Sequence, residues 1–233
     1  MAEDKKKKDK QPKGQQPGEK GQRKAKKAAA PEAQAAAADD QPQQPAPPAR
    51  LAIAYHDRFA PALMQQFKYK NKLQVPRLEK IVISMGLGKA VTSGEKGKME
   101  QAEKELTVIA GQKPVRCKAK KSVANFKVRE GQETGLKVTL RGNRMYEFLD
   151  RMITLAIPRV KDFRGMNPEG FDKAGNFNFG FTEQTVFPEV DSAAMTFQQG
   201  MNITMVTTAG TPNEGRELLK AFGFPFRTDE KQQ

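Results

Sequence analysis

Apolar side chains are distributed very unevenly along this chain. Residues 1–50 contain no aromatic side chain and no Leu, Ile or Val, whereas apolar and charged residues are mixed from Leu51 onward. A segment without bulky apolar side chains cannot bury enough area to offset the conformational entropy that it would lose on ordering. We therefore predict a disordered, low-complexity, basic extension over residues 1–50 and one folded domain over residues 51–233.

Apolar residues at spacings of three and four predict four helical regions in the folded domain. The first has an apolar face from Tyr55 to Phe67, which Pro61 interrupts because proline suits the first helical turn but not the interior. We expect a short helix before Pro61 and a second helix that starts at or near it. The other three run from Met99 to a glycine cap at Gly111, from a cap at Asn143 to a stop before Pro158, and from a cap at Thr211 to Gly223.

Runs rich in β-branched or alternating residues predict the strands. They cover residues 80–85, a segment around Val115, residues 136–140 and residues 201–208. Residues 161–182, which are rich in Gly, Asn and Phe, are expected to form a long surface loop that runs into a hairpin. Because several strand pairs lack room for a crossover helix, the predicted fold is α+β, with a single mostly antiparallel sheet and helices packed on one face.

The net charge of the chain indicates a polyanionic partner. The chain has 41 Lys and Arg residues against 27 Asp and Glu, which gives a formal net charge of +14. The first 50 residues hold 12 basic and 7 acidic residues, so the folded domain keeps +9. Nucleic acid is therefore the expected partner. The extension is either a loose electrostatic arm on RNA or simply a solvated segment.

The sequence does not favour a membrane protein, a secreted protein or an enzyme. No run approaches the roughly 18 apolar residues of a membrane span, and the segment after Met1 lacks the apolar stretch of a secretory signal, so we expect a cytoplasmic protein. His56, the only histidine, is expected at the surface, and Cys117, the only cysteine, is expected as a buried strand thiol. We predict no catalytic residue, no metal, no cofactor and no small-molecule substrate. The turn Gly86-Leu87-Gly88-Lys89 is either a tight turn or one whose N–H groups meet an RNA phosphate.

The densest cationic segment of the folded domain has the composition of a phosphate-binding surface. Each phosphate that a cation neutralises releases counterions, so a cluster of cations supplies salt-sensitive affinity. Phe126 within the segment offers a stacking surface for an unpaired base. The nearby strand adds a second cationic face that also carries a hydroxyl group. The segment contains Lys113, Arg116, Lys118, Lys120, Lys121, Lys127 and Arg129, and the strand face contains Lys137, Thr139 and Arg141.

Nine motifs, in this order and at this spacing, resemble one protein family over about residues 51–227. They are Val75–Gly88, Gly111–Pro114, Ala119–Ser122, Phe126–Gly131, Lys137–Gly142, Arg144–Arg151, Pro158–Gly165, Glu183–Glu189 and Phe224–Phe226. The family is the bacterial large-subunit ribosomal protein that binds 5S rRNA, often called large-subunit protein five. The resemblance implies a structural constituent of the large subunit that helps attach 5S rRNA in the central protuberance. An RNA-modifying enzyme or a general RNA chaperone is the alternative function.

The resemblance also implies three groups of site residues. The exposed sheet face and the turn after the first strand would bind 5S rRNA and large-subunit rRNA through Ser84, Met85, Gly86, Gln112, Lys113, Lys137, Thr139 and Arg141. The basic loop would contact the P-site tRNA through Lys118, Lys120, Lys121, Phe126, Lys127 and Arg129. An inter-subunit bridge to a small-subunit head protein would use Phe171, Asn176, Phe177 and Phe179. Ser84 stands where the family usually has Asn, which shortens the reach and removes an amide.

Overall fold

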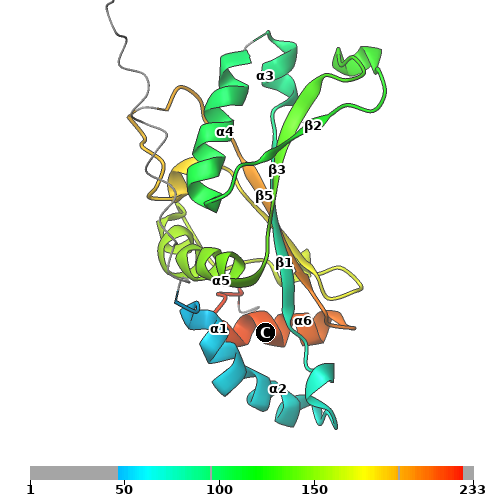
Figure 1. Cartoon of the computed structure of the whole chain (residues 1–233), viewed down its shortest axis with the longest axis vertical. Helices are drawn as coiled ribbons and strands as arrows, with labels where there is room; N and C mark the ends of the chain where they lie inside the picture. Colours follow the sequence, from blue (N-terminus) through cyan, green and yellow to red (C-terminus); the bar gives the residue numbers. More distant parts are fainter. Residues whose placement is uncertain (1–46, 95, 194, 228–233) are drawn as a thin grey trace, which may run out of the picture. The chain divides into compact units, whose positions relative to one another are not determined.

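The computed structural model describes residues 47–94, 96–193 and 195–227 (Figure 1). Up to residue 46, the predicted extension lies outside the described residues. The folded part starts slightly before Leu51, because Ala49 is buried and Arg50 is the first residue of a helix. Arg50 also pairs with Asp150 through two hydrogen bonds, one of them from Nε to Oδ2 at 3.1 Å. This pair ties the start of the folded part to a helix about a hundred residues later.

Five strands form one antiparallel sheet in the order β2-β3-β1-β5-β4. The strands are β1 Leu78–Gly86, β2 Val115–Lys118, β3 Glu133–Leu140, β4 Phe177–Phe181 and β5 Met201–Thr207. β1 is therefore the central strand, and β2 and β4 form the two edges. β4 falls in the segment for which a loop and hairpin were expected, and it pairs with β5 along its whole length.

Six α-helices and several single turns complete the described part of the chain. The helices are α1 Arg50–Ala54, α2 Ala60–Phe67, α3 Gly88–Thr92, α4 Lys96–Ala110, α5 Gly142–Arg151 and α6 Pro212–Ala221. Two π-helical turns are η1 Tyr55–Phe59 and η4 Met152–Ala156. The 3₁₀ turns are η2 Lys72–Gln74, η3 Ala124–Phe126, η5 Ile157–Arg159, η6 Pro168–Gly170 and η7 Gln184–Val186.

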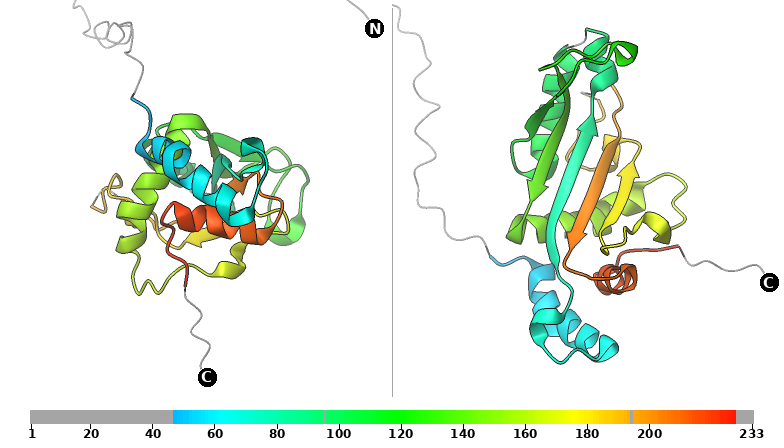
Figure 2. Two further views of the ribbon diagram at one scale, coloured as in Figure 1. Left: turned by 90° about the horizontal axis from the view of Figure 1, so that it is seen from below. Right: turned by 90° about the vertical axis from the view of Figure 1, so that its right-hand side faces the viewer.

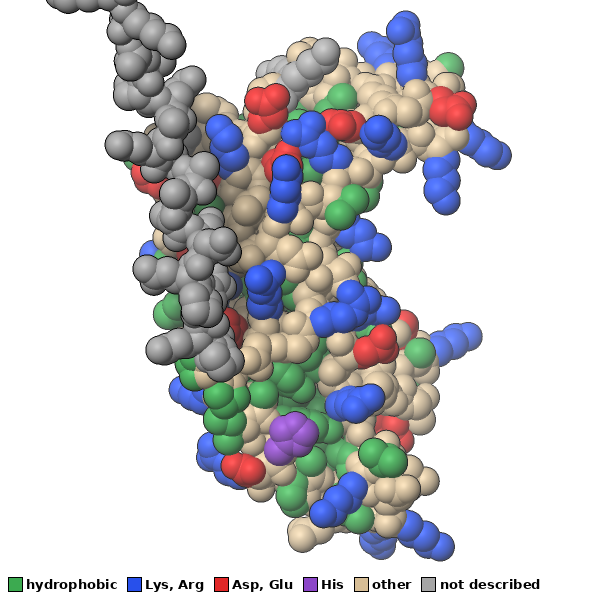
Figure 3. All heavy atoms as spheres, in the orientation of Figure 1, with side chains coloured by type: hydrophobic (Ala, Val, Ile, Leu, Met, Phe, Trp, Pro, Cys, Tyr) green, Lys and Arg blue, Asp and Glu red, His purple; other side chains and the backbone are tan. Residues whose placement is uncertain are grey.

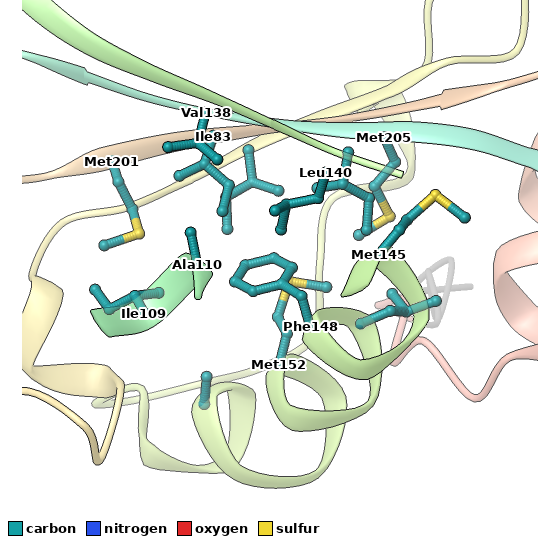
Figure 4. Packing of buried hydrophobic residues seen from close by; sticks show 14 of the residues in the cluster. Ile83, Ile109, Ala110, Val138, Leu140, Met145, Phe148, Met152, Met201 and Met205 are labelled. Carbon is teal, nitrogen blue, oxygen red and sulfur yellow. The ribbon is translucent and has the colours of Figure 1, made fainter. Parts of the chain in front are cut away.

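Helices α4 and α5 cover one face of the sheet and leave the other face without a helix (Figures 1 and 2). The core lies in this single layer between sheet and helices. Phe148 of α5 points from below toward Val138 and Leu140 of β3, and all three side chains are at most 2% exposed (Figure 4). The prediction of an α+β fold, with one antiparallel sheet and helices on one face, is confirmed.

A π-helical turn precedes each of the two prolines that were expected to divide or stop helices. Ahead of Pro61, the N–H of Ala60 donates to the carbonyl of Tyr55. A proline has no N–H group and its ring clashes with the carbonyl four residues earlier, and a wider turn relieves both problems. The expected second helix near Pro61 is confirmed, since α2 starts at Ala60 with Pro61 in its first turn, and η1 joins it to α1 without a gap.

The helix caps are partly as predicted. Thr211 caps α6, since its hydroxyl accepts a hydrogen bond from the N–H of Glu214 at 3.4 Å. Asn143 does not cap α5: the helix begins at Gly142, its N-cap is Arg141, and no side chain caps it. Gly111 and Gly223 follow α4 and α6 with φ of 63° and 85°, a conformation that glycine adopts without strain.

Candidate nucleic-acid interface

Strand alternation separates a buried side and an open side of the sheet. On β1, Ile81, Ile83 and Met85 are 0–2% exposed and face the helices. The residues between them face the other side, and the same holds on β3 and β5. We call this other side the open face and define it by Lys80, Val82, Ser84, Lys137, Thr139, Asn178, Asn202, Thr204 and Val206.

The register of the sheet arranges the open face in rows. Ser84 of β1 lies between Lys137 of β3 and Asn202 of β5. In the next row, Val82 lies between Thr139 and Thr204. The right-hand view of Figure 2 looks onto these strands, with the helices behind them. A ligand on this side of the sheet therefore meets polar groups from three adjacent strands at once.

Apart from Met85, the side chains predicted to bind rRNA on β1 and β3 are available to a partner. Lys137 and Arg141 are exposed and Thr139 is half-buried, and no helix covers them. Within the described ranges, the side chains of Ser84, Lys137 and Thr139 form no hydrogen bond or ion pair with the protein. The prediction that the cationic face of the sheet stays open is confirmed.

Met85 has to be removed from the predicted contact surface. Its side chain is 2% exposed and lies on the buried side of β1, because it alternates with Ser84 and Gly86. Ser84 is half-buried on the open face and Gly86 is exposed at the end of the strand. The sequence motif was read as continuous, although consecutive strand residues point to opposite faces.

Gln112 and Lys113 lie in the short turn between α4 and β2. Gln112 is half-buried, and within the described residues its side chain forms no hydrogen bond. Lys113 is exposed, and its Nζ atom lies 4.0 Å from Oε1 of Glu103. An exposed pair at this distance contributes little and leaves the ammonium group accessible.

Arg116 differs from the other cations of the basic segment because two carboxylates hold it. Its Nε donates to Oε2 of Glu103 at 2.8 Å, and its Nη1 donates to Oε2 of Glu133 at 3.1 Å. The hydrogen bond to Glu103, followed by that to Glu133, raises the pKa of the guanidinium above its usual value. This group links α4 to β3, and its charge is compensated within the protein.

The basic loop, residues 118–129, is held by its own backbone. Val123 and Val128 exchange two hydrogen bonds at 2.9 and 3.2 Å, and Ala119 donates to the carbonyl of Gln132 at 2.8 Å. Lys127 adopts a left-handed conformation with φ of 52°, and Phe126 before it is 73% exposed. The cations of this loop with no ion pair in the described ranges are Lys118, Lys120, Lys121, Lys127 and Arg129.

Most residues predicted for the inter-subunit bridge are buried or form contacts within the protein. Phe177 is 0% exposed, and its ring lies 4.7 Å from that of Phe171, centroid to centroid. Phe179 is half-buried against Phe177 and Phe224. Asn176 donates to Oδ2 of Asp172 at 2.8 Å and accepts from the N–H of Thr207 at 3.0 Å. A buried ring cannot touch a partner, so Phe177 can act there only by shaping the turn.

The structure also places His56, Cys117 and the turn after β1. His56 is exposed, as predicted. Cys117 is not a buried thiol but is partly exposed, because β2 is an edge strand whose Val115 and Cys117 face the open side. The turn after β1 starts α3, and Leu87 within it is buried and donates its N–H to the carbonyl of Thr134 at 2.9 Å.

No helix in the described ranges is long and apolar enough to cross a membrane. In the same part of the chain, no group of three or more His, Cys, Asp or Glu side chains is placed to hold a metal ion.

The polar residues that β4 and β5 add to the open face were not among the residues predicted to bind rRNA. Asn202 and Asn178 are exposed and Thr204 is half-buried. The alternation of residues 201–208 already separates them from the apolar positions of that strand. Their place beside Ser84 depends on which strands pair, and that pairing is not visible in the sequence.

Comparisons with known proteins place this geometry in a family. Residues 71–129 match the family model described as ribosomal protein L5, and residues 133–226 match the model described as the C-terminus of the same ribosomal protein family. A protein of Alkaliphilus metalliredigens named large ribosomal subunit protein uL5 is 54% identical over 178 residues, 76% of this chain and 98% of that protein. Proteins of the same name from Thermosipho africanus and Kocuria rhizophila are 56% and 51% identical over 173 and 180 residues, which cover 74% and 77% of this chain and 94% of each relative.

Proposed function

The chain belongs to the ribosomal protein L5 family, and on that premise we propose that it is a structural constituent of the large ribosomal subunit that binds 5S rRNA. Its relatives are large-subunit proteins, so its place is the ribosome in the cytoplasm, and its role there is not enzymatic. Binding of 5S rRNA would help to attach that RNA to the large-subunit rRNA in the central protuberance.

The open face is the observation that carries this proposal. A preformed sheet can recognise folded RNA without rearranging, because its side chains already stand in rows at fixed spacing. Lys137 and Arg141 supply cations for phosphates, while Ser84 and Thr139 supply hydroxyl groups for sugar or base edges. Gly86 ends β1, and Gln112 and Lys113 lie in the turn before β2, where Lys113 faces Glu103 of α4. Phosphate contacts would set the position of the RNA, and the hydroxyl contacts would discriminate among RNAs.

The basic loop is proposed to contact the P-site tRNA rather than 5S rRNA. The unpaired cations of the loop and the exposed ring of Phe126 form a compact surface at one end of the domain (Figures 1 and 3). A tRNA elbow presents phosphates together with stacked bases, which suit cations and an aromatic ring. In Figure 3 the right-hand outline is hollowed between this loop and the lower end of the domain, and Lys and Arg side chains line the hollow.

The turn before β4 is proposed to contact a small-subunit head protein. Because Phe177 is buried, the contacting groups would be the exposed residues 172–174, with Phe171 and Phe179 contributing their accessible edges. Asn176 would act by holding the turn against β5. The structural role of these residues and the proposed contact are therefore compatible.

Replacing Thr139 with Val tests the assignment of the open face to 5S rRNA. The substitution keeps the side-chain shape and removes one hydroxyl, so we expect affinity for 5S rRNA to fall by about 1–2 kcal/mol, with an unchanged melting temperature. Filter binding against 5S rRNA and an unrelated folded RNA, at two salt concentrations, measures both affinity and preference.

The matched control is Thr154→Val, because Thr154 is exposed on η4 and its hydroxyl donates only to the backbone carbonyl of Asp150. Unchanged 5S rRNA affinity in Thr139→Val would contradict the assignment. Equal affinity of the natural protein for both RNAs would favour a general RNA chaperone instead.

A further inference from the structure

The open face divides into a cationic half and a neutral half. On the side of β3 and β1, Lys137 and Lys80 point away from the core, and Arg141 follows at the end of β3. On the other side, β5 and β4 contain no lysine or arginine at all. Their open-face residues are Asn202, Thr204, Val206, Asn178 and Gly180. The two halves belong to one rigid hydrogen-bonded sheet, so one ligand can cover both.

Asn202 occupies the middle of the neutral half. Its Cα partner is Ser84 on one side and Gly180 on the other. Its Oδ1 atom lies 3.1 Å from the point where a Cβ atom on residue 180 would stand. The carboxamide therefore extends over the glycine of β4, where no side chain competes with it for space. Asn202 is exposed, and its side chain forms no hydrogen bond within the described part of the chain.

The next row of the sheet also presents polar, uncharged side chains. Thr204 of β5 pairs with Asn178 of β4, and neither side chain forms a hydrogen bond with the described protein. Two carboxamides and a hydroxyl therefore lie within two adjacent rows. An amide offers two donors and one acceptor with two lone pairs, which matches the edges of bases and the 2′-hydroxyl of ribose. A neutral amide gains far less from a phosphate than a cation does, because it releases no counterions.

We infer that Asn202, supported by Asn178 and Thr204, reads base edges or ribose hydroxyls of the same RNA whose phosphates the cationic half holds. This inference rests on the proposed function and deepens it, since it adds the carboxamides of β5 and β4 to the hydroxyl groups of Ser84 and Thr139 that discriminate among RNAs, while the cations of β3 and β1 position the RNA. The two halves then differ in a measurable way, because only contacts with phosphate change the dependence of affinity on salt concentration.

The experiment compares Asn202→Ala with Lys137→Ala in binding to 5S rRNA over a series of salt concentrations. For Asn202→Ala we expect a loss of about 3- to 10-fold at every salt concentration, with an unchanged slope of log affinity against log salt. For Lys137→Ala the slope should decrease by about 0.7–0.9, the value of one lost phosphate contact. Asn213→Ala is the control, because Asn213 is exposed at the start of α6 and lies outside the sheet.

A second variant tests whether loss of the carboxamide group causes the weaker binding of Asn202→Ala. Ser84 and Asn202 are Cα partners, so their Cβ atoms lie within about 5.5 Å of each other. Adding Ser84→Asn to Asn202→Ala returns a carboxamide to the same row and should recover part of the affinity. A double variant as weak as Asn202→Ala alone would overturn the proposal.

The outcomes separate this inference from the proposed function. If Asn202→Ala binds as the natural protein does while Lys137→Ala and Thr139→Val are weakened, the neutral half does not read RNA and the inference falls alone. If Asn202→Ala reduces the salt slope, the residue acts through phosphate and the inference also falls. If the natural protein shows no preference for 5S rRNA over unrelated RNA, the proposed function fails, and the inference fails with it.

Discussion

Asp172 and Asn176 hold the turn before β4 by side-chain hydrogen bonds rather than by apolar packing. One carboxylate oxygen of Asp172 accepts from the N–H groups of Ala174 and Asn176 at 3.0 and 2.8 Å. The other accepts from the amide of Asn176 at 2.8 Å. Asn176 in turn accepts from the N–H of Thr207, which joins the turn to β5. Asn176, which was expected in a bridge to another protein, therefore uses its side chain to stabilise the fold.

Replacing Asp172 with Ala should therefore loosen the turn in a pH-dependent way. The hydrogen bond from the Asn176 side chain lowers the pKa of Asp172 below its ordinary value of 3.8. A lowered pKa in the folded state means that this stabilisation is complete well above pH 3.8 and is lost as the pH falls through the folded value. Since Asp172 is exposed, we expect a loss of no more than about 1 kcal/mol at pH 7.

Urea unfolding at pH 7, 5 and 3 measures this difference. The gap in stability between the natural protein and Asp172→Ala should be similar at pH 7 and 5 and smaller at pH 3. Asp57→Ala is the control, because Asp57 is exposed on η1 and its carboxylate accepts no hydrogen bond within the described ranges. A gap that widened as the pH fell would show that the carboxylate is not the stabilising form.

At the scale of one element, β3 combines two tasks in alternate residues. Leu136, Val138 and Leu140 are 0–2% exposed in the core, while Lys137 and Thr139 stand on the open face. Val138 and Thr139 are adjacent and nearly equal in shape, yet they meet opposite environments. Exchanging valine and threonine at these two positions therefore tests which face of β3 is buried.

Val138→Thr is the counterpart of Thr139→Val and should affect stability rather than RNA binding. The new hydroxyl would stand among apolar side chains, where it has no hydrogen-bond partner on that face of the sheet (Figure 4). We expect a loss of about 1–3 kcal/mol in the free energy of unfolding, measured by urea titration. The folded fraction should still bind 5S rRNA as the natural protein does. Unchanged stability would mean that water reaches this side of the sheet.

The domain as a whole separates its cationic surfaces in space. The basic loop lies at one end of the sheet, and the segment after α2 lies at the other end (Figure 1). Glu103 and Glu133 compensate the charge of Arg116, so this cation of β2 contributes little to either surface. Separate surfaces would let the two proposed RNA contacts form without competition between them.

Changing Lys118, Lys120 and Lys121 together to Ala should separate the two RNA contacts. We expect 5S rRNA affinity of the isolated protein to change little, because these lysines lie at the end of β2 and in the basic loop, outside the residues that define the open face. In ribosomes assembled with the variant, chemical footprinting should show weaker protection of the P-site tRNA elbow, since three cations are lost.

Lys68, Lys70 and Lys72 provide a matched triple substitution at the other end of the domain. It removes the same charge and should leave the tRNA footprint unchanged. A large loss of 5S rRNA affinity in the loop variant, but not in this control, would mean that the loop serves 5S rRNA instead.

Much of this domain could be predicted from the sequence, because periodicity and turn chemistry are local properties. The alternation in residues 136–140 predicts β3 and both of its faces, and the cap at Thr211 predicts the start of α6. The start of α2 near Pro61 was also predicted, but the π-helical turn that joins it to α1 was not. A proline signals a break by its chemistry, whereas the helix is kept by packing around Tyr55 and Leu63, which are buried in the core.

What the sequence could not show are relations between residues far apart in the chain. Arg116 counts as a free cation until Glu103 and Glu133 are brought beside it, and Asn202 is an ordinary strand residue until β5 pairs with β1. Alternation follows from the geometry of a single strand, so composition and spacing reveal it. The choice and register of partner strands depend on how all the apolar faces fit into one core, and that is a property of the folded chain alone.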